Sequence, residues 1–308
     1  MDISLLLFEQ TLNGIQFGVF LFLIAAGLTL VFGIMNLVNL AHGALYMVGA
    51  YFGATFFAWS GSFLLAIVLT IPAMMVFGVV LEMIALRTLY ERDHMDQVLA
   101  TFGLILFFNE VVRIIWGPES QPMPIPESLS GHVEIIAGAP YPEFRIAVIG
   151  VGLIVAIALY LLISKTRLGM QIRAGASNRA MVGALGVNIR LLYTLVFGLG
   201  AVLAGLSGVV AGPLLAVEPG MGEDMLVMSF VVIVIGGIGS IRGALVASIL
   251  VGIVETVGRS ILPLALEVIV SNEAAQTAGP ALASMLIYVV MAGVLFFRPE
   301  GLFSARTG

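Results

Sequence analysis

Three polar side chains recur at a spacing of three inside an apolar stretch near the N-terminus. They are Asn36, Asn39 and His42, and residues 34–43 around them carry no Asp, Glu, Lys or Arg. On a continuous helix this spacing places all three on one face, where amide and imidazole groups can hydrogen-bond a passing solute. Alternatively the helix breaks here, the asparagines cap its ends and His42 bonds a backbone carbonyl. The residues therefore predict either a polar pathway wall or a structural break beside one.

A second interruption, residues 235–243, reads Ile-Gly-Gly-Ile-Gly-Ser-Ile-Arg-Gly and contains four glycines. The first break leads into His-Gly-Ala-Leu at 42–45 and the second into Arg-Gly-Ala-Leu at 242–245. Paired breaks in two halves are typical of internally duplicated transporters, so a duplication is possible. The residues predicted to line a pathway are Asn36, Asn39, His42, Gly43, Tyr46, Gly236, Gly237, Gly239 and Ser240.

Ionisable residues inside apolar segments are the other candidates for chemistry, because charge is costly there. Two oppositely charged pairs stand at helical spacing, Glu110 with Arg113 and Glu255 with Arg259. Such pairs neutralise themselves and are predicted to be structural. Glu82 has only Arg87, five residues later, and is expected to reach water at its helix end. No catalytic residue and no metal site are predicted, and the absence of cysteine excludes disulfides and thiolate ligands.

The composition defines the elements that must position these residues. Hydrophobic residues make up 60% of the 308 residues, charged residues 10%, and the mean hydropathy is +1.14. This is typical of an all-α polytopic membrane protein, which we predict to form a single transmembrane domain over 1–308. About eight or nine helices are expected to cross, with broken or re-entrant segments among them. The apolar windows are 11–34, 43–60, 62–86, 97–116, 145–164, 191–216, 225–240, 243–263 and 279–297.

The basic residues indicate the orientation. Ten of the 13 Lys and Arg residues fall in four stretches, which are Arg87 with Arg92, residues 165–190, Arg242, and Arg298 with Arg306. Because cytoplasmic loops carry the excess of Lys and Arg, these stretches are expected inside. The N-terminus is then predicted outside and the C-terminus inside, with an odd number of crossings.

The longest segment predicted to lie outside is the loop 117–144. It contains half of the 12 prolines and four glutamates. A stiff, acidic loop of this kind can receive a soluble partner, or it can be a solvated connector folded over the helix ends. The sequence leaves both interpretations open.

Residues 165–190 are the most distinctive cytoplasmic segment, with five basic residues and no acidic one. Ser177 is a good N-cap, residues 178–185 have a helix-compatible composition, and Gly186 is placed to end the helix in a left-handed conformation. A two-turn helix does not persist in water alone. It must therefore pack on its own membrane domain or be received by another protein.

Three segments together resemble one family. They are Gly27–Leu45, the loop from Arg173-Ala174 to Gly186-Val187, and Gly236–Leu245, and they are similar to the permease subunits of branched-chain amino-acid ABC importers of the LivH type. The similarity extends from about residue 10 to the tail at Arg298–Leu302.

The resemblance implies partners. A second, LivM-like permease completes the channel, two cytoplasmic ATPases use ATP and Mg²⁺, and a periplasmic binding protein delivers the substrate; nucleic acid is not expected, and membrane lipid surrounds the helices. No cofactor is expected on this chain, whose sequence contains no Gly-x-x-x-x-Gly-Lys-Ser/Thr motif and one lysine, Lys165. The location implied is the bacterial inner membrane. The residues implied to meet an ATPase are Arg173, Ala174, Ser177, Asn178, Arg179, Ala180, Met181, Leu185 and Gly186.

Other function classes remain for comparison. An ion-coupled carrier is expected to place lone carboxylates near the midplane, and a passive channel does not require a basic cytoplasmic helix. The resemblance favours the importer over both. Branched-chain amino acids are the substrate implied, and urea, short amides and aromatic acids are not separated from them by these residues.

Overall fold

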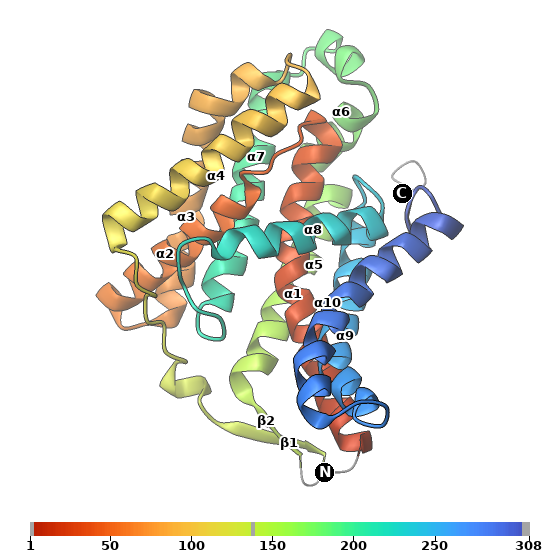
Figure 1. Cartoon of the computed structure of the whole chain (residues 1–308). Coiled ribbons are helices and arrows are strands. Elements are labelled where there is room, and N and C mark those ends of the chain that lie inside the picture. The colour runs from red at the N-terminus through yellow and green to blue at the C-terminus, as the bar shows by residue number, and fades with distance from the viewer. Residues whose placement is uncertain (1–2, 137–138, 304–308) are drawn as a thin grey trace. The chain divides into compact units, whose positions relative to one another are not determined.

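The computed structural model describes residues 3–136 and 139–303 of the chain. Within them lie ten α-helices and one two-stranded antiparallel sheet (Figure 1). The elements are α1 (Ile3–Met35), α2 (His42–Ser60), α3 (Phe63–Leu81), α4 (His94–Trp116), β1 (His132–Ile136), β2 (Ala139–Pro142), α5 (Glu143–Lys165), α6 (Arg167–Ala184), α7 (Ile189–Ala211), α8 (Met221–Gly236), α9 (Ile241–Leu266) and α10 (Asn272–Phe297).

Seven helices in the described part of the chain are long and apolar enough to cross a membrane, namely α1, α3, α4, α5, α7, α9 and α10. The prediction of an all-α polytopic membrane protein is confirmed. All nine predicted windows contain a helix, but α2 and α8 fall outside the seven. α8 has only 16 residues, and α2 carries His42 and two tyrosines among its 19. The first thirteen residues of α2 are almost all buried, so protein surrounds this helix for most of its length.

The chain divides into two compact units, each built from separate stretches of sequence. Unit 1 contains residues 1–22, 127–152 and 230–308, and unit 2 contains residues 23–126 and 153–229. The helices α1, α5 and α8 each run from one unit into the other. The single domain predicted over 1–308 stays a prediction.

In unit 2, α2 packs closely on α3 and α7, and small residues allow the close approach. A side-chain carbon built on Gly49 of α2 would overlap the backbone of Gly205 in α7, and one on Gly53 would meet Val209 at 2.5 Å. Glycines at helix crossings are common in membrane proteins because dispersion contacts between close backbones replace a hydrophobic driving force.

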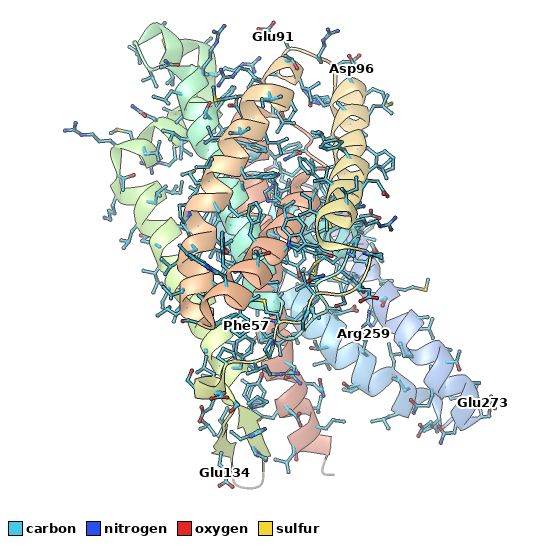
Figure 2. All side chains as sticks on the ribbon, turned by 90° about the vertical axis from the view of Figure 1, so that its left-hand side faces the viewer. Phe57, Glu91, Asp96, Glu134, Arg259 and Glu273 are labelled. Atoms are coloured by element: carbon cyan, nitrogen blue, oxygen red, sulfur yellow. The ribbon has the colours of Figure 1, made fainter. Side chains whose placement is uncertain are left out.

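In the side view, Glu91 and Asp96 mark the turn between α3 and α4 (Figure 2).

In unit 1, α9 packs against α10 and against the first half of α1 (Figure 1). Gly14 and Gly18 of α1 lie against Ile253 and Ser248 of α9. The hairpin β1–β2 leads into α5, and Asn13 ties its end to α1 by accepting hydrogen bonds from Tyr141 at 3.2 Å and from Arg145.

The described residues of the loop, 117–136 and 139–144, form more local structure than an extended connector has. A short 3-10 turn at Glu127–Leu129 precedes the hairpin, Gln121 pairs with Val217, and Met123 is buried beside Gly212. Burial of Tyr141 raises the pKa of its hydroxyl, against the opposing charge of Arg145, so the hydroxyl stays a donor. Binding of a partner by this loop stays a prediction.

Candidate functional site: two helix breaks and an exposed basic helix

The first helix break lies in unit 2, between α1 and α2. Asn36 has φ 52°, and its N–H donates to the carbonyl of Phe32 at 3.0 Å, so it ends α1 in the left-handed region. Asparagine adopts this conformation more readily than other non-glycine residues. Residues 37–39 are irregular, and α2 begins at His42. Of the two interpretations of Asn36, Asn39 and His42, the structure shows the helix break and not the shared helical face, because the backbone between them is not helical.

Two side chains of α4 satisfy the backbone of this break. Gln97 Oε1 accepts from the N–H of Val38 at 3.3 Å, and Thr101 Oγ1 accepts from the N–H of Leu40 at 3.2 Å. Both side chains are buried. Irregular backbone within a membrane domain requires such partners. Gln97 and Thr101 were not predicted, although two polar residues four apart on an apolar helix are a usable signal.

The side chains of the break fall into two environments. Asn36 is exposed, whereas Asn39, His42 and Tyr46 are fully buried. His42 Nε2 lies 3.2 Å from the carbonyl oxygen of Ile24, in line with the structural interpretation of this residue. The amide of Asn39 and the hydroxyl of Tyr46 have no hydrogen-bond partner among the described residues. Unpaired buried polar groups are rare and call for an explanation, such as a water or a second conformation that pairs them.

The start of α2 is held closely by α8. A side-chain carbon built on Gly43 would overlap the carbonyl of Gly222. At the next residue of α8, Glu223 Oε1 accepts a hydrogen bond from Asn109 Nδ2 at 2.8 Å. The space among Gly43, Met47 and Asn109 is too narrow to hold a water molecule. A solute can meet the buried residues of this break only in another conformation.

The second break lies in unit 1 and has the geometry of a tight turn. Gly237 and Gly239 have φ 100° and 84°, values that favour glycine. Ser240 caps α9 by accepting from the N–H of Gly243 at 3.1 Å. The N–H groups of Leu302 and Phe303 donate to the carbonyls of Ile235 and Gly236 at 2.8 and 3.0 Å. The C-terminal segment therefore pairs the last carbonyls of α8.

The two breaks have one local feature in common. Gly43 and Gly243 each occupy the first turn of a helix and lie against another backbone, that of Gly222 and of Gly236 respectively. The internal duplication stays a prediction. So does the role of Asn36, Asn39, His42, Gly43, Tyr46, Gly236, Gly237, Gly239 and Ser240 in a pathway.

The predicted ion pairs are present, and Glu82 differs from expectation. Arg113 and Glu110 lie 3.0 Å apart, and Arg259 pairs with Glu255. Glu82 is fully buried instead of reaching water. Its carboxylate accepts from Arg87 Nη2 at 3.1 Å, from the hydroxyl of Tyr90 at 2.6 Å and from the hydroxyl of Thr194 at 2.8 Å.

The exposed basic helix is α6. Thr166 caps its start, and Asn178 has the non-helical angles φ −155° and ψ 91°, which kink it. Asn178 Oδ1 accepts from the N–H of Met181 at 3.0 Å, so the second helical part is capped by Asn178 and the cap predicted at Ser177 is one residue too early. Gly186 has φ 89°, as predicted for the helix end.

One face of α6 rests on the bundle through Gly169, Ile172, Gly175 and Val182, which are buried. All nine residues predicted to meet an ATPase are exposed, including Met181 and Leu185 with exposed fractions of 58% and 76%. Among the described residues, no ion pair involves Arg173 or Arg179. Their charges are therefore available to another molecule.

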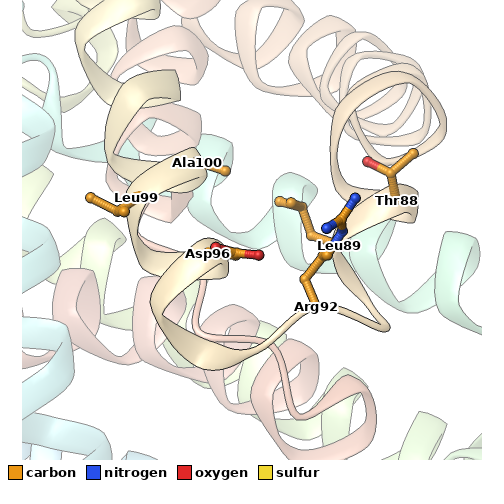
Figure 3. A pocket seen from close by; sticks show the side chains of 6 residues that line it. All are labelled: Thr88, Leu89, Arg92, Asp96, Leu99 and Ala100. Atoms are coloured by element: carbon orange, nitrogen blue, oxygen red, sulfur yellow. The ribbon is translucent and has the colours of Figure 1, made fainter.

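A shallow depression lies at the same α3–α4 turn that carries Glu91. It measures about 490 Å³ and opens widely to the surface (Figure 3). Arg92 and Asp96 line it beside aliphatic groups of Leu89, Leu99 and Ala100. An open depression of this shape does not enclose a small solute.

Comparison with known proteins gives a matching family model and several similar proteins. The family model described as branched-chain amino acid transport system / permease component matches residues 10–295. The high-affinity branched-chain amino acid transport system permease protein BraD of Pseudomonas aeruginosa is 30% identical over 241 residues, which cover 74% of this chain and 78% of that protein.

Two further relatives have the same kind of name. The high-affinity permease protein LivH of Escherichia coli is 28% identical over 220 residues, 66% of this chain and 70% of that protein. The probable LivH of Methanocaldococcus jannaschii is 26% identical over 230 residues, 70% of this chain and 69% of that protein. No solved structure matches the chain significantly.

Proposed function

Because this chain belongs to the family of branched-chain amino acid transport permease components, we propose that it forms part of the pathway through which an ATP-driven importer moves hydrophobic amino acids. The family and the seven apolar helices show a multi-pass membrane permease. The substrate is inferred from the names of the relatives, with branched-chain amino acids as the first choice. The residues buried around the first break are mainly apolar, which suits aliphatic side chains.

The observation that carries the proposal is the exposed face of α6. Arg173 and Arg179 form no ion pair with the described residues, and they stand beside exposed Met181 in the kinked helix and exposed Leu185 directly after it. Apolar residues exposed beside charge indicate a protein contact. A cytoplasmic ATPase is the proposed partner, and it would hydrolyse ATP with Mg²⁺ because this sequence lacks a nucleotide-binding motif.

The proposed mechanism is alternating access. Two partner ATPases close on ATP and move α6, and the breaks at residues 36–46 and 236–240 change which side the pathway faces. The packed first break supports a closed conformation, since the Asn39 amide and the Tyr46 hydroxyl are buried and have no hydrogen-bond partner in the described part of the chain. A ligand group or water can pair these atoms when the break opens.

The proposed assembly contains further subunits. A LivM-like permease completes the channel, and a periplasmic binding protein delivers substrate to the side that carries the hairpin β1–β2. The N-terminus is placed in the periplasm and the C-terminus in the cytoplasm of a bacterial inner membrane. Termini on opposite sides of the membrane require an odd number of crossings, and both seven and nine crossings meet this condition.

Uptake by the reconstituted assembly tests the proposal. The full set of subunits, purified together and placed in liposomes, should accumulate leucine only when ATP is supplied to the cytoplasmic side. Arg179→Glu and Ala180→Arg should abolish uptake while the permease remains inserted in the membrane. The matched control is Arg298→Glu, which reverses an exposed charge outside α6 and should transport normally.

Two results would contradict the proposal. Uptake that proceeds without ATP would support a carrier or channel. Normal uptake by both α6 variants would remove α6 as the ATPase contact.

A further inference from the structure

Glu82 lies where the chain departs from regular helix geometry. Residues Glu82–Leu86 form a π-helical turn at the end of α3. A π turn contains between four and five residues, so side chains five apart face each other, and Arg87 is brought onto Glu82. Single π turns inside helices occur often at functional positions.

The Glu82 carboxylate joins three segments of unit 2. It is fully buried, and its two oxygens are bonded by Arg87, Tyr90 and Thr194. The rings of Tyr90 and Tyr193 meet edge to face with centroids 5.3 Å apart. A buried carboxylate cannot lose such partners without a large desolvation cost, so the π turn and the first turns of α7 must move together.

The first turns of α7 are also the continuation of α6. Only four residues, 185–188, separate the two helices, and Asn188 caps α7 by accepting from the N–H of Leu191 at 3.1 Å. Gly175 of α6 lies against the side chain of Leu192. A displacement of α6 is therefore passed to Tyr193 and Thr194, the two α7 residues that hold the π turn.

On its other side, the π turn leads to the first break. Gln97 Nε2 donates to the carbonyls of Leu89 and Arg92, both at 3.2 Å, and its Oε1 accepts from Val38. One side chain therefore joins the turn after Glu82 to the irregular backbone of residues 36–41. Every contact in this series lies within unit 2.

We propose that Glu82 and Gln97 are positioning residues that link α6 mechanically to the first helix break. The proposal rests on the proposed function and assigns it a route. When α6 moves with its ATPase, α7 carries Thr194, Thr194 carries the Glu82 turn, and Gln97 transfers that movement to residues 38–40. Neither residue contacts substrate in this scheme.

The test measures substrate molecules transported per ATP hydrolysed by the complete complex in liposomes. Thr194→Val removes the hydroxyl that bonds Glu82 and nearly preserves the shape of the side chain, whereas Thr194→Ser keeps the hydroxyl. Glu82→Gln and Gln97→Met break the series at its two other points. Thr194→Val, Glu82→Gln and Gln97→Met should each lower the number of substrate molecules transported per ATP about tenfold or more, whereas Thr194→Ser should not. The rate of ATP hydrolysis should change by less than about twofold in all of them.

A matched control excludes a general effect of a buried carboxylate. Glu255 of α9 is 3% exposed and pairs with Arg259, but it lies in unit 1, outside this series. Glu255→Gln should keep the transport ratio of the parent complex. The double variant Thr194→Val with Gln97→Met should be no worse than either single variant, because both interrupt one route.

The outcomes separate the two proposals. A parent complex that transports without ATP contradicts the proposed function. A parent complex that is driven by ATP, together with a Thr194→Val variant of unchanged transport ratio, overturns the link alone. If Glu82→Gln fails to assemble, the comparison of Thr194→Val with Thr194→Ser still decides.

Discussion

Gly49 of α2 lies so close to Gly205 of α7 that a side-chain carbon at position 49 would overlap the Cα of residue 205. The two glycines let the backbones touch, and dispersion forces act over the whole crossing. This crossing supports the helix that begins at the first break. The residues of the break therefore depend on a contact made by no side chain at all.

Gly49→Ala should destabilise the protein, because the added methyl group must push α2 away from α7. Overpacking of a dense interior costs about 1–3 kcal/mol. The measurement is the thermal unfolding midpoint of the purified protein in detergent. Gly103→Ala is the control, since no atom of the described residues lies within 4 Å of its added carbon. Equal midpoints for the two variants would show that the crossing is not tight.

Thr101→Val should lower the stability of the first break. The change keeps the shape of the side chain but leaves the N–H of Leu40 without its partner, at a cost of about 1–3 kcal/mol. Hydrogen exchange at residues 38–41, followed by mass spectrometry, should show faster opening in the variant. Thr101→Ser keeps the hydroxyl and should behave like the parent; faster exchange in Thr101→Ser as well would point to lost packing as the cause.

Substitutions at Asn36 separate backbone conformation from side-chain function. Its φ of 52° suits glycine, so Asn36→Gly should fold normally, whereas Asn36→Val should lose about 1–2 kcal/mol. Expression level and the unfolding midpoint report folding, and leucine uptake reports function. Loss of uptake in a well-folded Asn36→Gly variant would show that the amide contacts the substrate or another subunit. Full uptake by the Asn36→Gly variant would show that the role of Asn36 is limited to ending α1.

The hydroxyl of Tyr90 should remain protonated at alkaline pH. Burial first, and then its hydrogen bond to Glu82, raise the pKa of Tyr90 above the ordinary value. Its stabilising contribution is therefore complete below about pH 10 and is lost only as the pH passes the higher value of the folded state. The phenolate absorbance of the parent and of Tyr90→Phe should be the same near pH 10. An additional titrating group in the parent at that pH would refute the buried environment.

The sequence was sufficient for properties that depend on composition over a whole segment. Each apolar window contains a helix, and the glycine-rich stretch 235–243 is a break, because hydropathy and glycine content act locally. The left-handed end of α6 at Gly186 is equally local. The helical spacing of Glu110 with Arg113 and of Glu255 with Arg259 also correctly predicted their pairing.

The properties that were missed depend on tertiary partners or on departures from the α-helical period. On an α-helix, residues five apart do not face each other, so the sequence does not predict that Arg87 pairs with Glu82. The π turn at Glu82–Leu86 brings the two side chains together. The sequence left a continuous helix and a break both open at residues 36–42, because the left-handed conformation of Asn36 that decides between them is not visible in a spacing of three. The spacing of Gln97 and Thr101 on an apolar helix is a usable signal for two structural polar residues, but it does not identify their partners, which lie about 60 positions away in sequence. The roles predicted for the pathway and for α6 stay predictions.

The bonds from Leu302 and Phe303 to the last carbonyls of α8 impose an order on biosynthesis. Both α9 and α10 lie between these partners in the chain, so the carbonyls of Ile235 and Gly236 cannot be paired until α10 has been inserted. Until then the end of α8 needs water or the translocation machinery to solvate it. Assembly of the second break therefore follows insertion of α10, and a variant that delays α10 also delays the pairing of the last carbonyls of α8.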